Sequence, residues 1–192
     1  MRHLSFKGIF PILQTPFNKK GQIVFEEVEN EVDWLIDIGV NGIGIAIASE
    51  VFKLNDEEKL KLLKTVVDRS SGKIPIIMNS GQESTEYTTY LSKKSEELGA
   101  KGLMIKPPVF DNVPQAMIEE HFINVASSVN IPIFLQDQGN SPISGDSAVR
   151  LSEKHENLSY IKLESIPTIP RFDYCNKNSS RDKYSWNYGI NS

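Results

Sequence analysis

A lysine near the end of an apolar run is the residue of this sequence best suited to covalent chemistry. Lys162 lies in the segment 158–163, where its neighbours are mostly apolar. A lysine withdrawn from water is held more easily as a neutral amine, and a neutral amine attacks a ketone to form a Schiff base. The alternative is that its side chain extends to solvent or pairs with Glu164. The local sequence leaves both interpretations open.

The remaining lysine, histidine and cysteine candidates are weaker. Lys106 also ends an apolar run, but Pro107-Pro108 follows at once and imposes an extended turn, so we expect this side chain to reach solvent. No metal-ligand spacing relates the three histidines and the single cysteine, which are His3, His121, His155 and Cys175. We therefore expect neither a metal ion nor a cofactor.

The elements that must position these residues alternate along the chain. Short apolar, β-branched runs are expected to be strands: Gly8–Leu13, Gly42–Ile47, Ile74–Met78, Gly102–Ile105, Ile131–Leu135 and Leu158–Leu163. Between them, stretches with helical period predict helices over Glu26–Ile38, Asp56–Val67, Ser84–Leu98, Pro114–Val125 and Asp146–His155. Strands that are apolar on both faces and separated by helices indicate a parallel sheet.

The strand starts recur about every 30 residues, which favours a barrel over a doubly wound sheet. The glycines Gly39, Gly42 and Gly44 resemble a dinucleotide fingerprint only loosely, because they precede and enter a strand rather than follow one. We interpret Gly39 as a helix C-cap and the others as close-packing positions. The fold class predicted is α/β, a TIM (β/α)8-type barrel that is incomplete, with about six β/α units.

The chain changes character after these six units. Residues 166–192 contain no Leu, Val, Ala, Met or Glu, and no helical or strand period is visible in them. We therefore divide the chain into a partial barrel, residues 1–165, and a divergent C-terminal tail, residues 166–192. We expect this tail not to be native barrel sequence, as would follow from a frame change or an early stop, the alternative being an ordinary C-terminal extension.

Composition excludes several classes of function. The chain has 192 residues and a formal net charge of −4, with no basic run, which argues against nucleic acid as a partner. No stretch approaches the roughly 18 apolar residues that a membrane span needs, and no signal peptide is visible. One cysteine cannot form an intrachain disulfide. We expect a cytoplasmic globular protein.

The carboxyl ends of barrel strands carry active residues, and here they carry a recognisable pattern. The chain resembles the dihydrodipicolinate synthase / N-acetylneuraminate lyase family of class I aldolases from about Gly8 to Ser165. The resemblance is carried by the order and spacing of Gly8–Phe17, Gly39–Ile43, Ser49-Glu50 with Leu54–Glu58, Gly99–Gly102, Pro107-Pro108, Ile131–Ile133 and Asn157–Ser165.

The resemblance implies roles for individual residues. Lys162 aligns with the lysine that forms a Schiff base with pyruvate or another 2-keto acid. The segment Ile47–Glu50 aligns with the loop that holds the keto acid's carboxylate, where Ala48 and Ser49 are the candidate binding residues and backbone N–H groups could bind the anion. Family resemblance also implies dimers or tetramers.

The sequence departs from the family pattern at several of these positions. The two threonines of the carboxylate loop are Ile47 and Ala48, and Ser49 is the remaining hydroxyl donor. The tyrosine that acts as acid and base aligns with Gln136, which cannot shuttle a proton, and the asparagine after it aligns with Asp137, which could. Phe110 occupies a substrate-binding position of the family without its phenol group.

Three functions remain open from the sequence. The first is a lyase or aldolase that acts on pyruvate or another 2-keto acid through Lys162, with Gln136 and Asp137 beside it. The second is a truncated, catalytically inactive remnant, whose exposed strand edges would promote pairing with another chain. The third is a binding module that keeps a keto-acid pocket without turnover.

Overall fold

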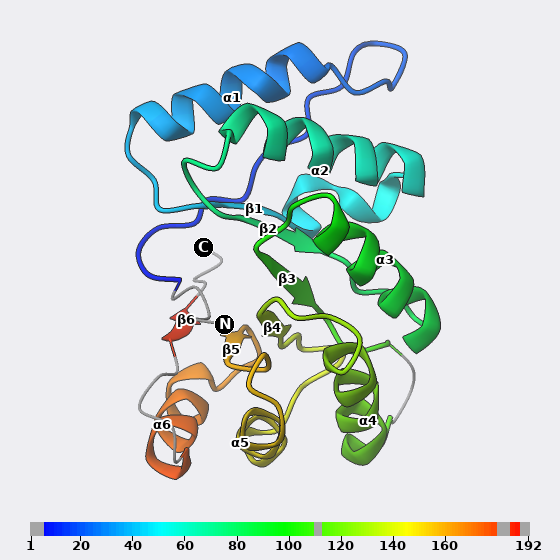
Figure 1. Ribbon diagram of the computed structural model, residues 1–192. Coiled ribbons are helices and arrows are strands. Elements are labelled where there is room, and N and C mark those ends of the chain that lie inside the picture. The colour runs from blue at the N-terminus through cyan, green and yellow to red at the C-terminus, as the bar shows by residue number, and fades with distance from the viewer. Residues whose placement is uncertain (1–5, 110–112, 180–184, 189–192) are drawn as a thin grey trace. The chain divides into compact units, whose positions relative to one another are not determined.

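The computed structural model describes residues 6–109, 113–179 and 185–188. Parallel strands alternate with helices, and the order of the strands is the order of the sequence (Figure 1). The α-helices are α1 Phe25–Asp37, α2 Asp56–Ser70, α3 Thr85–Glu97, α4 Gln115–Ala126, α5 Gly145–Lys154 and α6 Thr168–Asn178. The strands are β1 Ile43–Ile45, β2 Ile76–Asn79, β3 Gly102–Ile105, β4 Ile133–Gln136, β5 Tyr160–Leu163 and β6 Ser185–Tyr188.

The chain divides into two compact units. One unit, here called the N-terminal unit, contains residues 5–79 and 94–103. The other, here called the C-terminal unit, contains residues 80–93 and the chain from 104 onward, together with the first four residues.

In the N-terminal unit, β1 pairs in parallel with β2, with Ile43 opposite Ile76 and Ile45 opposite Met78. All residues of both strands are buried, as expected for strands that are apolar on both faces. Helices α1 and α2 lie side by side, and each turns a buried apolar stripe inward: Val28, Val32 and Leu35 on α1, and Leu62, Leu63 and Val66 on α2. The predicted periodicity of both helices is therefore confirmed.

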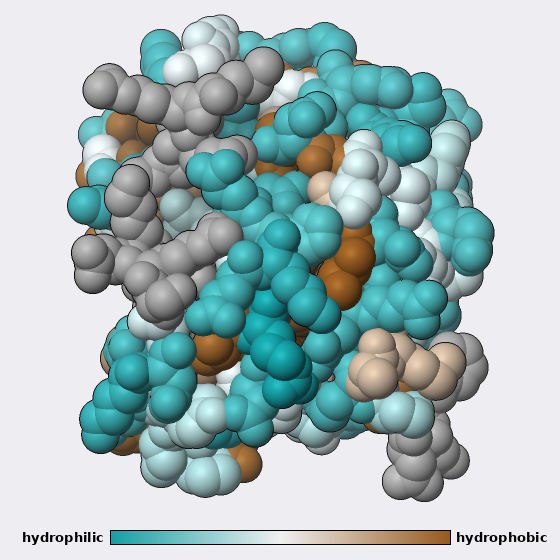
Figure 2. Space-filling view, turned by 60° about the horizontal axis from the view of Figure 1, so that its bottom comes forward, coloured by the Kyte–Doolittle hydropathy of each residue, from teal (hydrophilic) through white to brown (hydrophobic). Residues whose placement is uncertain are grey.

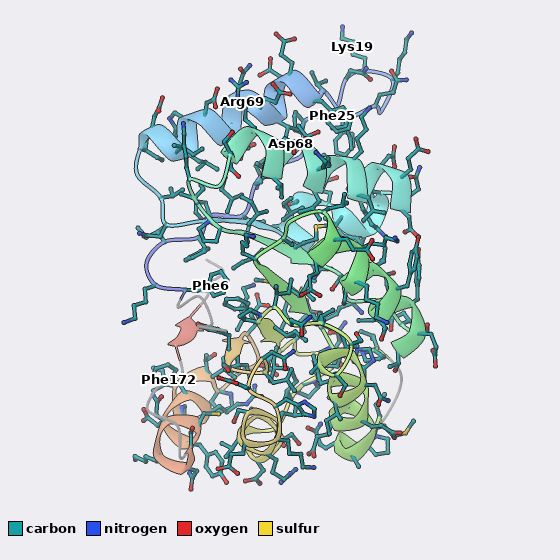
Figure 3. The ribbon with its side chains drawn as sticks, viewed as in Figure 1. Phe6, Lys19, Phe25, Asp68, Arg69 and Phe172 are labelled. Carbon is teal, nitrogen blue, oxygen red and sulfur yellow. The ribbon has the colours of Figure 1, made fainter. Side chains whose placement is uncertain are left out.

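Polar side chains join the outer surfaces of these two helices. Arg69, labelled in Figure 3, lies near the end of α2. It donates to Asp33 of α1, with Nε 2.8 Å from Oδ1, and reaches Glu29 at 3.4 Å. At the other end of the pair, the Lys61 ammonium lies 4.3 Å from the centre of the Phe25 ring. The three charged side chains are each more than 40% exposed, so these ion pairs contribute little to stability.

The first predicted strand, Gly8–Leu13, is shorter than the sequence indicates. Only Ile12 forms a bridge, in parallel with Gly44, and the Leu13 N–H donates to the Gly44 carbonyl at 2.9 Å. The prediction of a full strand is wrong because Pro11 has no N–H to donate and Gly8 has a φ of 97°. Of this segment only Leu13 is fully buried, and Ile9 is 70% exposed.

The glycines after α1 have the structural roles that the sequence indicates. Gly39 follows the end of α1 with a φ of 81°, and its N–H donates to the Ile36 carbonyl at 3.0 Å. A Cβ atom on Gly42 would lie 2.1 Å from Cε1 of Phe10 and 2.8 Å from the carbonyl oxygen of Pro75. Gly42 is therefore required by close packing.

Helix α2 begins with a capping box. The Asn55 side chain accepts from the Glu58 N–H at 2.9 Å, and the Glu58 carboxylate accepts from the Asn55 N–H at 3.0 Å. We expect Asn55→Ala to lower the free energy of unfolding by about 1 kcal/mol, because one N–H group of the first turn loses its partner. Denaturant unfolding followed by circular dichroism measures this change. Glu57→Gln, an exposed change in the same turn, is the control, and equal effects of the two variants would contradict the capping explanation.

The C-terminal unit contains β4, β5 and β6, which pair in parallel in that order. In this register Phe134 lies opposite Tyr160, and their rings stack with centres 4.5 Å apart. Gln136 lies opposite Lys162, so the carboxyl ends of these two strands are level. Helix α5 packs against both α4 and α6 (Figure 1).

Regular structure continues beyond residue 165. Helix α6 packs on α5 and β5, and the backbone of β6 pairs with β5, although no such period is visible in the sequence. That residues 166–192 are not native barrel sequence stays a prediction, and α6 and β6 show that part of this segment has regular structure. Tertiary contacts specify α6, including a fully buried Cys175 and an ion pair made by Arg171.

The surface seen in Figure 2 is mainly hydrophilic, with separate brown areas of apolar residues between the polar ones. Large apolar side chains exposed on the described parts of the chain include Trp34 on α1, Ile38 directly after α1 and Ile169 on α6. Among the described residues, none of the helices has the length and apolar character that a membrane span requires.

Candidate active site

Three side chains of the C-terminal unit meet at the carboxyl ends of β4 and β5. The Lys162 ammonium lies 2.6 Å from Oε1 of Glu164, and the Gln136 amide donates to Oε2 of the same carboxylate at 3.1 Å. The Lys162 side chain is 22% exposed and that of Glu164 is 15% exposed. Lys162 is therefore half-buried, and it forms the ion pair with Glu164 that the sequence allowed.

The spacing of the two residues explains the pair. Side chains two residues apart in a strand point to the same face, so Lys162 and Glu164 project together as β5 ends. Gln136 reaches the same carboxylate because it lies opposite Lys162 in the ladder. A carboxylate, an amine and an amide thus form one connected polar group.

Asp137, the second predicted acid–base residue, is fully buried and differently engaged. Its carboxylate accepts from the Ile143 and Ser165 N–H groups, each at 2.8 Å, and from the Glu164 N–H at 3.2 Å. The Arg171 guanidinium donates to both of its oxygens, at 2.7 and 2.9 Å.

Two opposing effects act on the Asp137 carboxyl. Burial raises its pKa, but the Arg171 guanidinium and the N–H groups of Ile143 and Ser165 outweigh burial and hold the pKa below its usual range. A carboxylate that is kept ionised and accepts five hydrogen bonds is suited to holding backbone in place. It is poorly suited to carrying protons to and from a substrate.

The predicted carboxylate loop lies in the N-terminal unit, where two short 3-10 turns, Ile47–Ser49 and Val51–Lys53, follow β1. Ser49 is fully buried, and its hydroxyl donates to the Leu13 carbonyl and accepts from the Ala46 N–H. The Thr15 hydroxyl donates to the Ser49 carbonyl at 2.6 Å. The Ser49 hydroxyl is thus used by the backbone of its own unit, whereas Ala48 is exposed.

Phe110, the remaining predicted substrate-binding residue, lies outside the described residues. The chain before it is held by Glu83, whose carboxylate accepts from the Lys106 ammonium at 2.5 Å and from the Val109 N–H at 2.6 Å. Lys106 is 18% exposed at its side chain and paired. Its ammonium thus pairs with the Glu83 carboxylate after β2 and does not reach open solvent, contrary to the expectation from the sequence.

Near this ion pair, His121 of α4 is buried between α-helical elements of the C-terminal unit. Its Nδ1 lies 3.0 Å from the Thr85 hydroxyl at the start of α3, and its Nε2 has no hydrogen-bond partner. Burial, with the positive charge of Lys106 as a second cause, lowers its pKa to about 4, against the opposing effect of Glu83 and Glu86.

A shallow depression of about 430 Å³ in the N-terminal unit is lined by residues 14–16 and by one face of α1 that bears Glu27, Asn30, Glu31 and Trp34. The Glu31 carboxylate accepts from the Gln14 N–H at 3.0 Å, and burial raises the pKa of Glu31. The depression contains none of the predicted catalytic residues. Within the described residues, no group of three or more His, Cys, Asp and Glu side chains is arranged to hold a metal ion.

Arg171 is the functional candidate that the sequence did not reveal. It lies in the segment whose composition looked foreign to a barrel, and nothing in its local sequence relates it to Asp137, 34 residues earlier. The contact of Glu164 with Lys162 could have been predicted from the sequence, because Glu164 lies two residues after Lys162 at the end of a strand.

Alternating parallel strands and helices with polar groups at the strand ends define the class of (β/α)-barrel proteins, and solved structures agree. Dihydrodipicolinate synthase from Aquifex aeolicus matches 96% of this chain with a TM-score of 0.90 and 29% identity, over 63% of its own length. The incomplete TIM barrel predicted from the sequence is thereby confirmed, with five to six β/α units present.

Sequence comparison gives the family within this class. The family model for the Dihydrodipicolinate synthetase family matches residues 5–169. L-2-keto-3-deoxyarabonate dehydratase of Azospirillum brasilense is 31% identical over 165 residues, which is 83% of this chain and 53% of that protein. The 4-hydroxy-tetrahydrodipicolinate synthase of Methanococcus aeolicus is 32% identical over 164 residues, 85% of this chain and 55% of the relative.

The chain belongs to the dihydrodipicolinate synthetase family, as its motifs predicted. It spans little more than half the length of these two curated relatives.

Proposed function

We propose that this chain is a lyase of its family that acts on a 2-keto acid through a Schiff base on Lys162. The observation that carries the proposal is the Lys162–Glu164–Gln136 group at the ends of β5 and β4. Membership of a lyase family supports the reaction class, and the name of one relative, L-2-keto-3-deoxyarabonate dehydratase, supports a 2-keto acid as the substrate.

The geometry supports the following chemistry. Once the Lys162 amine has lost its proton, it adds to the C2 carbonyl carbon. The carbonyl oxygen then takes one proton from the amine and one from solvent and leaves as water, which gives an iminium. The iminium draws electrons from C3, so that a C3 proton can be removed or a bond to C3 can break. Glu164, which contacts the amine directly, is placed to take that proton and to return it to the leaving group.

This assignment gives Glu164 the acid–base role for which the sequence offered Gln136 and Asp137. In our proposal Gln136 orients the Glu164 carboxylate and hydrogen-bonds the substrate, whereas Asp137 holds the backbone. Ala48, Ser49 and Phe110 are proposed as substrate-binding residues on the family resemblance alone. We further propose residues 1–165 as the partial barrel, a cytoplasmic location, and self-association as a dimer or tetramer.

The experiment that tests the proposal is reductive trapping. The chain is incubated with pyruvate, the simplest 2-keto acid, and with a 2-keto-3-deoxy sugar acid, then reduced with borohydride and digested for mass spectrometry. We expect a secondary-amine adduct on the peptide that contains Lys162. No adduct at Lys162 with any of several 2-keto acids would contradict the proposal.

Replacement of Glu164 separates Schiff-base formation from turnover. We expect Glu164→Gln to be trapped by borohydride but to turn over roughly 10²- to 10⁴-fold more slowly, because the amide cannot accept or return a proton. Turnover is measured by keto-acid consumption. Glu156→Gln, a change at an exposed position before β5, is the control. Equal turnover of Glu164→Gln and the unmodified chain would show that another group moves the proton.

A keto-acid-binding module without turnover is the second candidate. It is favoured by Asp137, whose carboxylate is held by the Ile143 N–H and the Arg171 guanidinium and is not free to carry protons. This alternative predicts pyruvate affinity that persists in Lys162→Ala, measured by calorimetry, with no consumption of the keto acid. Loss of binding in that variant favours the lyase.

A further inference from the structure

An arginine beyond the part of the chain that the family model matches is tied to the end of β5. Arg171 of α6 lies past residue 169, where that match ends. Its guanidinium donates to both oxygens of Asp137 and also to the carbonyl groups of Ile143 and Ser165. Its side chain is 17% exposed, and that of Asp137 is fully buried.

Asp137 in turn forms hydrogen bonds with the backbone on both sides of the proposed reactive lysine's strand end, residues 162–165. Its own N–H donates to the Lys162 carbonyl at 3.0 Å. Its carboxylate accepts from the N–H groups of Glu164 and Ser165. Both ends of the segment 162–165 are therefore fixed by a single residue, and the orientation of Glu164 toward the Lys162 ammonium depends on that backbone.

A buried carboxylate can hold backbone in this way only while it is charged and paired. Without Arg171, the Asp137 carboxylate would be left in the interior without its counter-ion, a state that buried charges avoid by taking up a proton or by moving toward water. Either response weakens the bonds to the Glu164 and Ser165 N–H groups. The planar guanidinium binds both oxygens at once, which a lysine ammonium cannot reproduce.

We propose that Arg171 is a positioning residue for the Schiff-base site: through Asp137 it holds the 162–165 backbone so that the Glu164 carboxylate meets the Lys162 amine. The inference rests on the proposed function and extends it to α6, a helix that lies mostly beyond the region that the family model matches. It makes the C-terminal segment part of the working site, whereas the alternative is that Arg171 serves only to anchor α6.

The test uses matched variants of the full chain. It compares the rate and pH profile with which borohydride traps the pyruvate Schiff base on Lys162. We expect Arg171→Met to be trapped roughly ten- to a hundredfold more slowly, since small displacements of reacting groups have effects of this size. We also expect its pH profile to move to lower pH, because an amine that loses the Glu164 carboxylate beside it holds its proton less tightly. Arg171→Lys should recover part of the rate.

Arg150→Met is the matched control, because Arg150 of α5 pairs with Glu119 away from this network and is about half exposed. It should be trapped as the unmodified chain is.

Trapping of folded Arg171→Met at the unmodified rate and pH profile would overturn the inference and leave the proposed function intact. If Arg171→Met does not fold, Asp137→Asn, which keeps the shape of the side chain, takes its place, and unchanged trapping of that variant overturns the inference. Absence of trapping in the unmodified chain would instead refute the proposed function itself.

Discussion

Replacing Lys162 by methionine should abolish reductive trapping by 2-keto acids completely, while replacing Lys106 by methionine should leave trapping unchanged. Both lysines end a strand, both are partly buried at their side chains, and each pairs with one glutamate, Glu164 and Glu83 respectively. The two variants therefore remove the same charge from similar surroundings. The second group on the shared carboxylate differs: it is the Gln136 side-chain amide beside Lys162 and the Val109 backbone N–H beside Lys106.

Methionine suits both positions because it keeps the length and the apolar stem of the side chain without the amine. Trapping is measured by the mass of the intact chain and by mapping the modified peptide. A thermal melt of each variant checks that it is folded. A residual adduct in Lys162→Met, or loss of the adduct in Lys106→Met, would show that a lysine other than Lys162 is the reactive one.

Acidification should destabilise the chain between about pH 6.5 and 4, with His121 as the main cause. Burial and the Lys106 charge lower the pKa of His121 from 6.5 to about 4 in the folded chain, so the unfolded chain binds this proton more readily. The stabilisation by neutral His121 is complete above pH 6.5 and is lost as the pH falls toward 4. The expected loss is about 2 kcal/mol by pH 5 and about 3 kcal/mol by pH 4.

Urea unfolding at several pH values measures this dependence. His121→Gln should flatten the profile between pH 6.5 and 5, because the amide keeps a polar contact for the Thr85 hydroxyl but does not titrate. His155→Gln is the control, since His155 is the other histidine that the structure describes and is only half-buried. An unchanged slope in His121→Gln would assign the acid sensitivity to other groups.

Below about pH 4, protonation of Asp137 is expected to destabilise the chain further. Asp137 has a pKa below its usual range in the folded chain, so its stabilisation is present above the unfolded value of 3.8 and is lost as the pH falls through the lower folded value. The His121 and Asp137 contributions therefore occupy different pH windows. The Asp137→Asn variant should alter only the more acidic one.

Local patterns were sufficient to predict most of the fold. Apolar runs separated by amphipathic stretches located β1 to β5 and α1 to α5 to within a few residues, and the roughly 30-residue period indicated a barrel. These predictions succeed because side-chain periodicity and burial act within a single strand or helix. The failures were at Gly8–Leu13, where Pro11 and Gly8 prevent a full ladder, and at α6, whose sequence carries no clear period.

The candidate site divides in the same way. The sequence by itself determined the family and the position of Lys162 at the end of an apolar strand, because both depend on residue types in linear order. Only the tertiary structure decided that Glu164 meets the amine, that Ser49 is used by the backbone, and that Asp137 is a buried ion-pair partner of Arg171. Those contacts join residues of different strands, loops and helices, and the free energy that selects them comes from burial and charge pairing that exist only in the folded chain.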